Sequence, residues 1–190
     1  MDINFILRLL TLALLVIFRL YWFLHENESA IKKPKTTYKK RIIERVFGRI
    51  VAGYLVLNLL GFIIYPFHNI IINLIGLALV IFGFIEAIFA RKILDSNWTD
   101  ANEYQIKKDH ELITKGIYKY VRHPIYGGIL LMVPGVLLVA GSYTFIIAFF
   151  ILLMVLESFA RREEKLLTKH FGSKYKDYMK TTKKFIPFVY

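Results

Sequence analysis

The sequence predicts an all-α integral membrane protein with about five transmembrane helices, made of a first span and two helical hairpins, under a cytoplasmic cap. Composition is the first reason, because 56% hydrophobic and 16% aromatic residues leave too little polar surface for a soluble monomer. Several apolar stretches also approach the about 20 residues that a helix needs to cross a bilayer. Most Lys and Arg residues fall between these stretches, in three segments.

The first three spans are predicted from continuous apolar runs. Ile3–Leu24 is the first, and a cleaved signal peptide is the competing interpretation. That run is long for a signal peptide, Arg19 interrupts its far end, and no small-x-small cleavage site follows. The second span covers 46–65 and the third covers 70–90, with only Pro66–Asn69 between them, so we expect a tight helical hairpin.

The last apolar stretch, Gly127–Leu156, is too long for one span. We expect a second hairpin with arms over 125–139 and 143–160, in which Pro134 introduces a kink and the chain turns near Gly141. Both arms are short, so the pair is either tilted or only partly spanning.

The distribution of basic residues predicts the orientation in the membrane. With five spans, the basic segments Lys32–Arg45, Arg91–Arg122 and Arg161–Lys184 all lie on one face, while the turns near His68 and Gly141 carry no Lys or Arg. The positive-inside tendency makes the basic face cytoplasmic, with the N-terminus outside and the C-terminus inside. We expect a multi-pass protein of a prokaryotic cell membrane.

Charge and composition also exclude several classes of function. The net charge of +12 is explained by topology and by anionic lipid headgroups, so we expect the lipid bilayer as partner and no nucleic acid. The chain has no Cys, which excludes disulfides and a Cys nucleophile. Its five His residues show no helical ligand spacing, so we expect no metal. The oligomeric state stays open.

Two polar segments are predicted to form the cytoplasmic cap. Residues Asp95–Arg122 show no clear period and are expected to form an ordered loop with short helical turns. The second segment, Glu157–Tyr190, extends the last membrane helix to a stop at Gly172. A short amphipathic piece over Tyr175–Met179 follows, and Phe185–Phe188 is expected to lie on the membrane interface.

Six motifs in this cap, in order and at matching spacing, carry a family resemblance: Asn97-Trp98, His110-x-Leu112, Gly116-Ile117-Tyr118, Arg122-His123-Pro124-x-Tyr126, Glu163-Glu164-x-x-Leu167 and Phe171-Gly172-x-x-Tyr175-x-x-Tyr178. The pattern resembles the isoprenylcysteine carboxyl methyltransferase family, and the related phospholipid N-methyltransferases share much of it. The resemblance covers 94–190 as a methyltransferase core of cap loop, hairpin and C-terminal helix. Residues 1–93 match only as three generic membrane helices.

The resemblance implies a membrane-embedded methyltransferase that uses S-adenosylmethionine under the cytoplasmic cap and takes a lipophilic substrate from the bilayer. It favours O-methylation of a prenylcysteine-type carboxylate, with N-, S- or O-methylation of a phospholipid or another lipophile as the alternative. A second alternative is an NADPH-dependent membrane reductase of the sterol-reductase type, which carries a similar Arg-His-Pro signature but usually has Asn where Ile125 stands. A transporter or scaffold would be expected to show broken helices in repeated halves.

The chemistry of the cofactor suggests a role for each polar residue. Pro124 suits the first turn of a helix, which places His123 near the N-cap and Arg122 just outside, as an anion site for the methionine carboxylate. Catalytic candidates are Arg122 and Glu164. The other candidates for cofactor binding, taken partly from the family motifs, are His110, Leu112, Gly116, Tyr118, His123, Pro124, Tyr126 and Glu163.

Candidates on the substrate side are Asn97, Trp98, Arg161 and Arg162. The family often has an Arg about one turn before the Glu-Glu pair, and Phe159 stands there instead. Adjacent residues point about 100° apart on a helix, so we expect one of Glu163 and Glu164 to face solvent.

Two further predictions concern the third span. Gly76 and Gly83, one heptad apart, are expected to permit close helix packing. Glu86 is a functional candidate because of its depth in that span, although Arg91 or a neighbouring helix could neutralise it.

Overall fold

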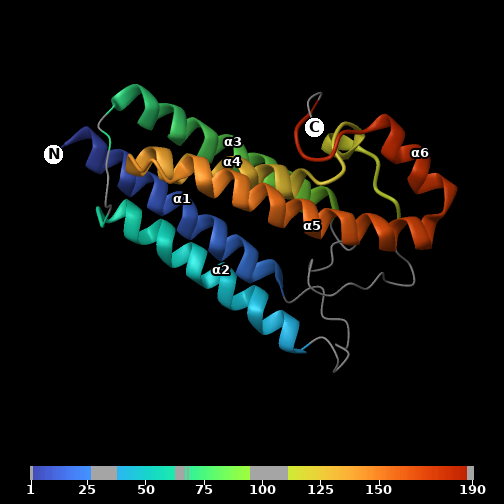
Figure 1. The fold of residues 1–190 in the computed structure, drawn as a ribbon. Coiled ribbons are helices and arrows are strands. Elements are labelled where there is room, and N and C mark those ends of the chain that lie inside the picture. The colour runs from blue at the N-terminus through green and yellow to red at the C-terminus, as the bar shows by residue number, and fades with distance from the viewer. Residues whose placement is uncertain (1, 27–37, 63–66, 68, 95–110, 188–190) are drawn as a thin grey trace.

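In the computed structural model the described residues are 2–26, 38–62, 67, 69–94 and 111–187. Within them the chain forms an elongated bundle of five long helices with a small cap at one end (Figure 1). The elements are α1 (Ile3–Glu26), α2 (Tyr38–Leu59), α3 (Ile70–Leu94), η4 (Gly116–Lys119), α4 (Pro124–Ala140), α5 (Phe145–Phe171) and α6 (Ser173–Thr181). The five long helices match the five predicted segments, and the all-α class is confirmed.

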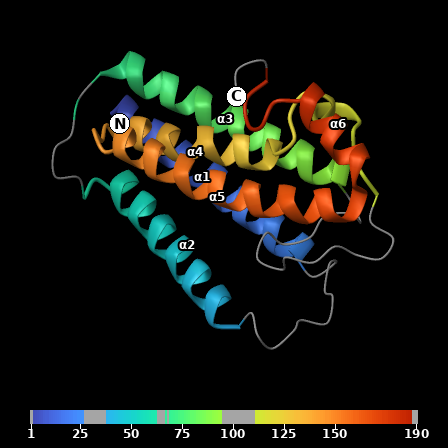
Figure 2. The same ribbon diagram turned by 45° about the vertical axis from the view of Figure 1, so that its right-hand side comes forward.

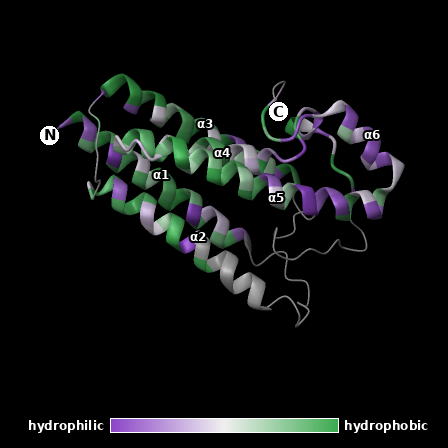
Figure 3. Cartoon of the chain, in the orientation of Figure 1, coloured by the Kyte–Doolittle hydropathy of each residue, from purple (hydrophilic) through white to green (hydrophobic). Residues whose placement is uncertain are grey.

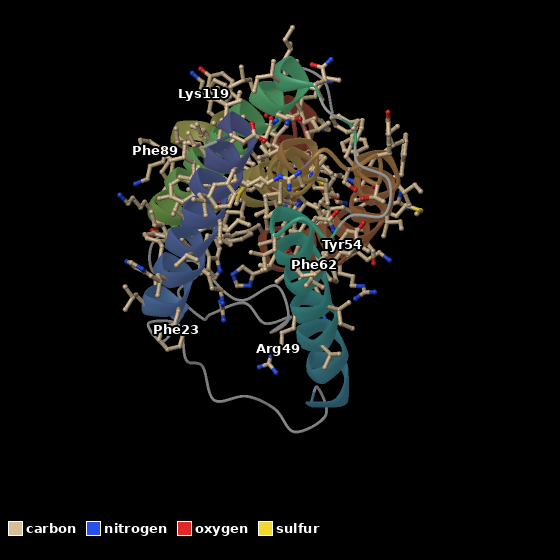
Figure 4. All side chains as sticks on the ribbon, turned by 90° about the vertical axis from the view of Figure 1, so that its left-hand side faces the viewer. Phe23, Arg49, Tyr54, Phe62, Phe89 and Lys119 are labelled. Carbon is tan, nitrogen blue, oxygen red and sulfur yellow. The ribbon has the colours of Figure 1, made fainter. Side chains whose placement is uncertain are left out.

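The surface of the bundle is that of a protein in lipid. Two helices, α1 and α3, are long and apolar enough by themselves to cross a bilayer, and α4 is a shorter apolar helix. Large apolar side chains such as Phe23, Phe62 and Phe89 are more than half exposed and lie on the outside of the bundle (Figure 4). Hydrophilic residues gather mainly at the end where α5 finishes and α6 lies (Figure 3). The number of spans stays a prediction.

Helix α4 forms the centre of the bundle, and most of its residues are buried. It packs most extensively against α3, along a line of glycines. A Cβ atom on Gly83 would lie 2.3 Å from the carbonyl oxygen of Gly128, and one on Gly76 would lie 2.7 Å from that of Gly135. Such short distances mean that the two backbones touch, which only glycine allows. The predicted role of Gly76 and Gly83 in close packing is therefore confirmed.

The predicted second span is wrong at its end, because α2 finishes at Leu59 and not near residue 65. Gly61 has a left-handed φ of 95°. Its N–H bonds to Asn58 O at 3.1 Å, and the N–H of Phe62 bonds to Leu57 O at 3.0 Å. This pair of hydrogen bonds is a Schellman motif, which terminates a helix at a glycine.

The expected hairpin between the second and third spans is also corrected. Helices α2 and α3 run antiparallel, but α2 packs against α4 and α1, and its first half points away from the bundle (Figure 2). The glycine line explains this arrangement, because it gives α3 a closer partner in α4. The connection over 63–66 and residue 68 lies outside the described residues.

The second hairpin forms as predicted. Helix α4 continues through Pro134 and ends at Gly141, which has a φ of 78°. The N–H groups of Gly141 and Ser142 bond to Leu138 O and Leu137 O, which again makes a Schellman motif. Helix α5 then runs for 27 residues, past the predicted span and through the Glu-Glu pair, to its predicted stop before Gly172.

Candidate cofactor site

The candidate site lies at the end of the bundle where α4 begins, and a C-terminal strap of residues 182–187 builds one side of it (Figure 1). The strap pairs in parallel with the segment before α4. The N–H of Arg122 bonds to Lys183 O at 2.9 Å, the N–H of His123 bonds to Lys184 O at 3.0 Å, and the N–H of Lys183 bonds to Tyr120 O at 2.9 Å. The strap thereby fixes the backbone that carries Arg122 and His123.

Phe185 corrects the prediction that this part of the chain rests on the membrane interface. Its side chain is fully buried, in a cluster with Leu130, Leu156 and Ala160. Its carbonyl oxygen would lie 2.3 Å from a Cβ on Gly127, so the strap lies directly on the first turns of α4. Residues 188–190 lie outside the described part of the chain.

His123 is the N-cap residue of α4 and Pro124 follows at the first helical position, as predicted. The imidazole of His123 is buried and faces both members of the Glu-Glu pair. Its Nδ1 lies 3.3 Å from Glu163 Oε2, and its Nε2 lies 3.4 Å from Glu164 Oε1. The expectation that one of these Glu residues faces solvent is therefore wrong. The two carboxylates leave α5 in different directions, but the imidazole of His123 has one nitrogen near each of them.

Arg122 is held by the protein on two sides. Its Nε donates to Glu164 Oε1 at 2.9 Å, and its Nη1 donates to the carbonyl oxygens of Thr182 and, at 3.4 Å, Met179. Its side chain is 12% exposed. A guanidinium has five N–H donors in a fixed fork, and within the described residues the two N–H groups of Nη2 make no hydrogen bond.

An aromatic wall closes another side of the site. The rings of His123 and Tyr126 stack with their centroids 5.6 Å apart, and Phe185 meets both rings edge to face. The hydroxyl of Tyr126 donates to Glu163 Oε1. The side chain of Glu163 is 28% exposed, against 14% for Glu164, so Glu163 is the more accessible carboxylate.

The mutual contacts shift the protonation of both partners. Burial would raise the pKa of Glu164, but hydrogen bonds from His123 and Arg122 and the positive charges of His123 and Lys184 outweigh it and lower that pKa to about 2. Burial would lower the pKa of His123, whereas its hydrogen bonds to Glu163 and Glu164 raise that pKa above its ordinary 6.5. The pair therefore favours an ionised Glu164 and a protonated His123.

Tyr118 connects the elements that surround the site. It is buried in η4, the short helical turn expected in the cap loop, and its hydroxyl donates to Ala90 O of α3 at 3.4 Å. The hydroxyl of Tyr178 on α6 donates to Tyr118 O at 2.6 Å. Burial raises the pKa of both phenols well above the ordinary value, so they remain donors. These contacts join α3, η4 and α6.

Several predicted residues lie outside this cluster. Gly116 begins η4 with a φ of 60°, against Ile93 of α3, and Leu112 lies half-buried in the segment before it. Arg161 is 69% exposed and bonds to Glu157, while the guanidinium of Arg162 lies over the ring of Phe159. The predicted residues Asn97, Trp98 and His110 fall in 95–110, which is not described.

Lys184 and Glu157 were not identified from the sequence as residues beside the site. Lys184 on the strap lies 2.8 Å from Glu157 Oε1 and 3.7 Å from Glu164 Oε2. Their proximity depends on the strap folding back over α5, for which the local sequence gives no signal. Glu86, the functional candidate in the third predicted span, lies beside Gly127. Its Oε1 atom is buried and makes no hydrogen bond in the described structure.

The family model for phospholipid methyltransferase matches residues 71–174, which include nearly all of α3 and the whole of α4 and α5, with the Glu-Glu pair. The chain belongs to the phospholipid methyltransferase family.

Several similar proteins are isoprenylcysteine methyltransferases. The chain is 36% identical over 85 residues to a protein-S-isoprenylcysteine O-methyltransferase of Schizosaccharomyces pombe, a match that covers 43% of this chain and 35% of that protein. It is 32% identical over 130 residues to one of Dictyostelium discoideum, which covers 61% of this chain and 49% of the relative. The chain thus spans half or less of the length of these two relatives.

A solved structure supports the fold. The eukaryotic intramembrane Ras methyltransferase ICMT (isoprenylcysteine carboxyl methyltransferase) superposes with a TM-score of 0.55 at 25% sequence identity. The match covers 81% of this chain and 50% of that one. The α-helical bundle is therefore the fold of an integral membrane methyltransferase.

Proposed function

We propose that this protein is a membrane-embedded methyltransferase that uses S-adenosylmethionine and methylates the carboxylate of a lipophilic, prenylcysteine-type acceptor. The observation that carries this proposal is the Arg122–Glu164–His123–Glu163 cluster at the N-terminus of α4. Membership of the family and the isoprenylcysteine O-methyltransferase activity of the relatives favour the same reaction.

The residues present fit the polar groups of S-adenosylmethionine. The first N–H groups of α4 have no partner within the helix, and together with Nη2 of Arg122 they suit the methionine carboxylate. Glu163, the more exposed carboxylate, suits the ammonium or the ribose hydroxyls. The aromatic wall of Tyr126 and Phe185 suits the adenine or the sulfonium.

Glu164 has a different role in this proposal. Because it is engaged by Arg122, His123 and Lys184, it is a positioning residue that keeps the guanidinium of Arg122 turned toward the cofactor. When bound, S-adenosylmethionine supplies an electrophilic methyl group on a sulfonium, so an acceptor carboxylate that is already ionised at pH 7 needs no base. The tasks left for the protein are alignment of the two reactants and exclusion of water.

The reaction is tested by incubating the purified full chain with methyl-labelled S-adenosylmethionine and N-acetyl-S-farnesylcysteine. We expect label to enter the acceptor as an ester, which mild alkali releases as methanol. Alkali-stable label in an amine phospholipid would instead indicate N-methylation. Absence of transfer to either acceptor, from protein shown to be folded, would overturn the proposed function.

A further inference from the structure

Lys184 is a largely buried cation on the membrane side of the cofactor cluster. Its side chain is 14% exposed, and its ammonium bonds to Glu157 Oε1 at 2.8 Å and lies 3.7 Å from Glu164 Oε2. Glu157 and Glu164 are two helical turns apart on one face of α5. Lys184 therefore lies closer to the apolar half of the bundle than the contact between Glu164 and Arg122 does.

The hydrogen bonds of this ammonium are incomplete. An ammonium has three N–H donors. In the described structure Nζ of Lys184 makes one hydrogen bond, to Glu157, and its distance to Glu164 is too long for a second. Arg122, by contrast, makes three hydrogen bonds to the protein. Two N–H donors of Lys184 therefore make no hydrogen bond in the described structure and are available to a ligand.

The surroundings of Lys184 suit an amphipathic anion. Its neighbour in the strap, Phe185, belongs to an apolar cluster with Leu156 and Ala160 of α5 and Leu130 of α4. Leu156 directly precedes Glu157, so the ion pair lies at the edge of that cluster. Half-buried apolar side chains of α5, among them Phe149, Leu152 and Leu153, pack against that cluster. A ligand with a carboxylate on a long apolar chain would place its charge at Lys184 and its chain along this part of α5.

We propose that Lys184 binds the carboxylate of the methyl acceptor and is the residue that selects an anionic acceptor. The proposal rests on the proposed function. Glu157 orients the ammonium, and the two remaining N–H donors hold the carboxylate beside the cofactor cluster. The C-terminal strap thus supplies the cation on the substrate side that the exposed Arg161 does not.

The test compares acceptor binding and cofactor binding in a Lys184→Met variant of the full chain. Loss of hydrogen bonds to a charged group predicts an increase of about tenfold to a hundredfold in the KM for N-acetyl-S-farnesylcysteine. We expect the Kd for S-adenosylhomocysteine to change much less than this KM, because Lys184 makes no hydrogen bond to Glu164 in the described structure. A Lys184→Arg variant keeps the charge and should recover most of the loss. The matched control is Lys183→Met, because that neighbouring side chain is exposed.

An analogue of the acceptor separates charge recognition from a structural role. Wild-type protein should bind the carboxylate more tightly than the same molecule with a carboxamide, and the Lys184→Met variant should bind both equally. If Lys184 only fastens the strap, the variant will melt earlier and lose affinity for cofactor and acceptor together, which overturns the proposal. Competition by an anionic phospholipid in wild type alone would assign the site to a lipid phosphate instead.

Acceptor binding can be measured in the presence of S-adenosylhomocysteine, which has no methyl group to transfer. This measurement tests the role of Lys184 separately from the proposed function. A chain that binds the carboxylate through Lys184 but transfers no methyl group would contradict only the proposed function. A chain that methylates the carboxylate with the same KM in the Lys184→Met variant would contradict only the role of Lys184.

Discussion

His123 connects the two carboxylates of the site, because one ring nitrogen faces Glu163 and the other faces Glu164. A His between two carboxylates is stabilised as a cation, and Glu164 is stabilised as an anion in return. The geometry of the site therefore depends on pH through both partners.

We predict that the protein is most stable at mildly acid pH. The lowered pKa of Glu164 gives a stabilising contribution that is complete above its ordinary value of 4.5 and is lost as the pH falls toward about 2. The raised pKa of His123 gives a contribution that is complete below 6.5 and is lost as the pH rises through the raised value. The apparent melting temperature in detergent should therefore peak between pH 4.5 and 6.5.

Variants test each side of that profile. Glu164→Gln should reduce the decline on the acid side, to which the lowered pKa of Glu157 also contributes, and His123→Gln should remove the decline on the alkaline side. An exposed pair such as Lys180 and Asp177 provides a control, and Asp177→Asn should leave the profile unchanged. Profiles that are the same for all four proteins would contradict the assignment.

At this scale, the sequence predicts residues whose signal is local. Pro124 after His123 marks a helix start, which is such a local signal. The Glu-Glu pair, in contrast, is expected near the cofactor only because it matches a motif of the family. Lys184 could not be predicted in the same way, because its position depends on a strap that pairs with residues some 60 positions earlier. Side-chain direction also escaped prediction, as both Glu residues face His123.

Among the elements, the contact between α3 and α4 determines where the rest of the bundle packs. Gly83 and Gly128 approach so closely that a Cβ on either would lie within 2.5 Å of the carbonyl oxygen of the other. Sequence spacing predicted the close packing of α3, but it did not identify α4 as the partner. To predict the partner, Gly76 and Gly83 of α3 have to be matched with Gly135 and Gly128 of α4 in an antiparallel pair.

We predict that Gly83→Ala destabilises the protein by about 1–3 kcal/mol, because the added methyl group forces the two helices apart. Thermal unfolding in detergent, followed by circular dichroism, measures the effect. Gly53→Ala is the control, since nothing lies within 4 Å of its Cβ position, and replacing glycine in a helix favours folding. Equal melting temperatures for Gly83→Ala and wild type would contradict the contact.

The strap is the second element that can be tested. We predict that Phe185→Ala costs about 3–5 kcal/mol and weakens S-adenosylhomocysteine binding, because a fully buried ring that contacts His123 and Tyr126 is removed. Phe89→Ala is the control, because that ring is 62% exposed on the outside of the bundle. Thermal unfolding and calorimetry measure the two effects. A Phe185→Ala variant with unchanged melting and binding would show that the strap is dispensable.

For the whole molecule, the distribution of basic residues predicts that the cofactor site faces the cytoplasm. The absence of Cys from the chain makes this testable with single cysteine probes. A Tyr143→Cys variant, at an exposed position near the turn between α4 and α5, should react with an impermeant maleimide in intact cells. A Lys176→Cys variant, on the exposed side of α6, should react only after the cells are opened. The reverse pattern would contradict the predicted orientation.

The central claim is that the cluster of Arg122, His123, Glu163 and Glu164 holds S-adenosylmethionine. Calorimetry with S-adenosylhomocysteine on detergent-purified protein tests it most directly, with NADPH as the competing ligand. The account predicts that wild type binds S-adenosylhomocysteine and not NADPH, and that the Arg122→Ala, Glu164→Ala double variant, shown to be folded, binds neither. Binding of NADPH alone, or of S-adenosylhomocysteine by the double variant with wild-type affinity, would contradict it.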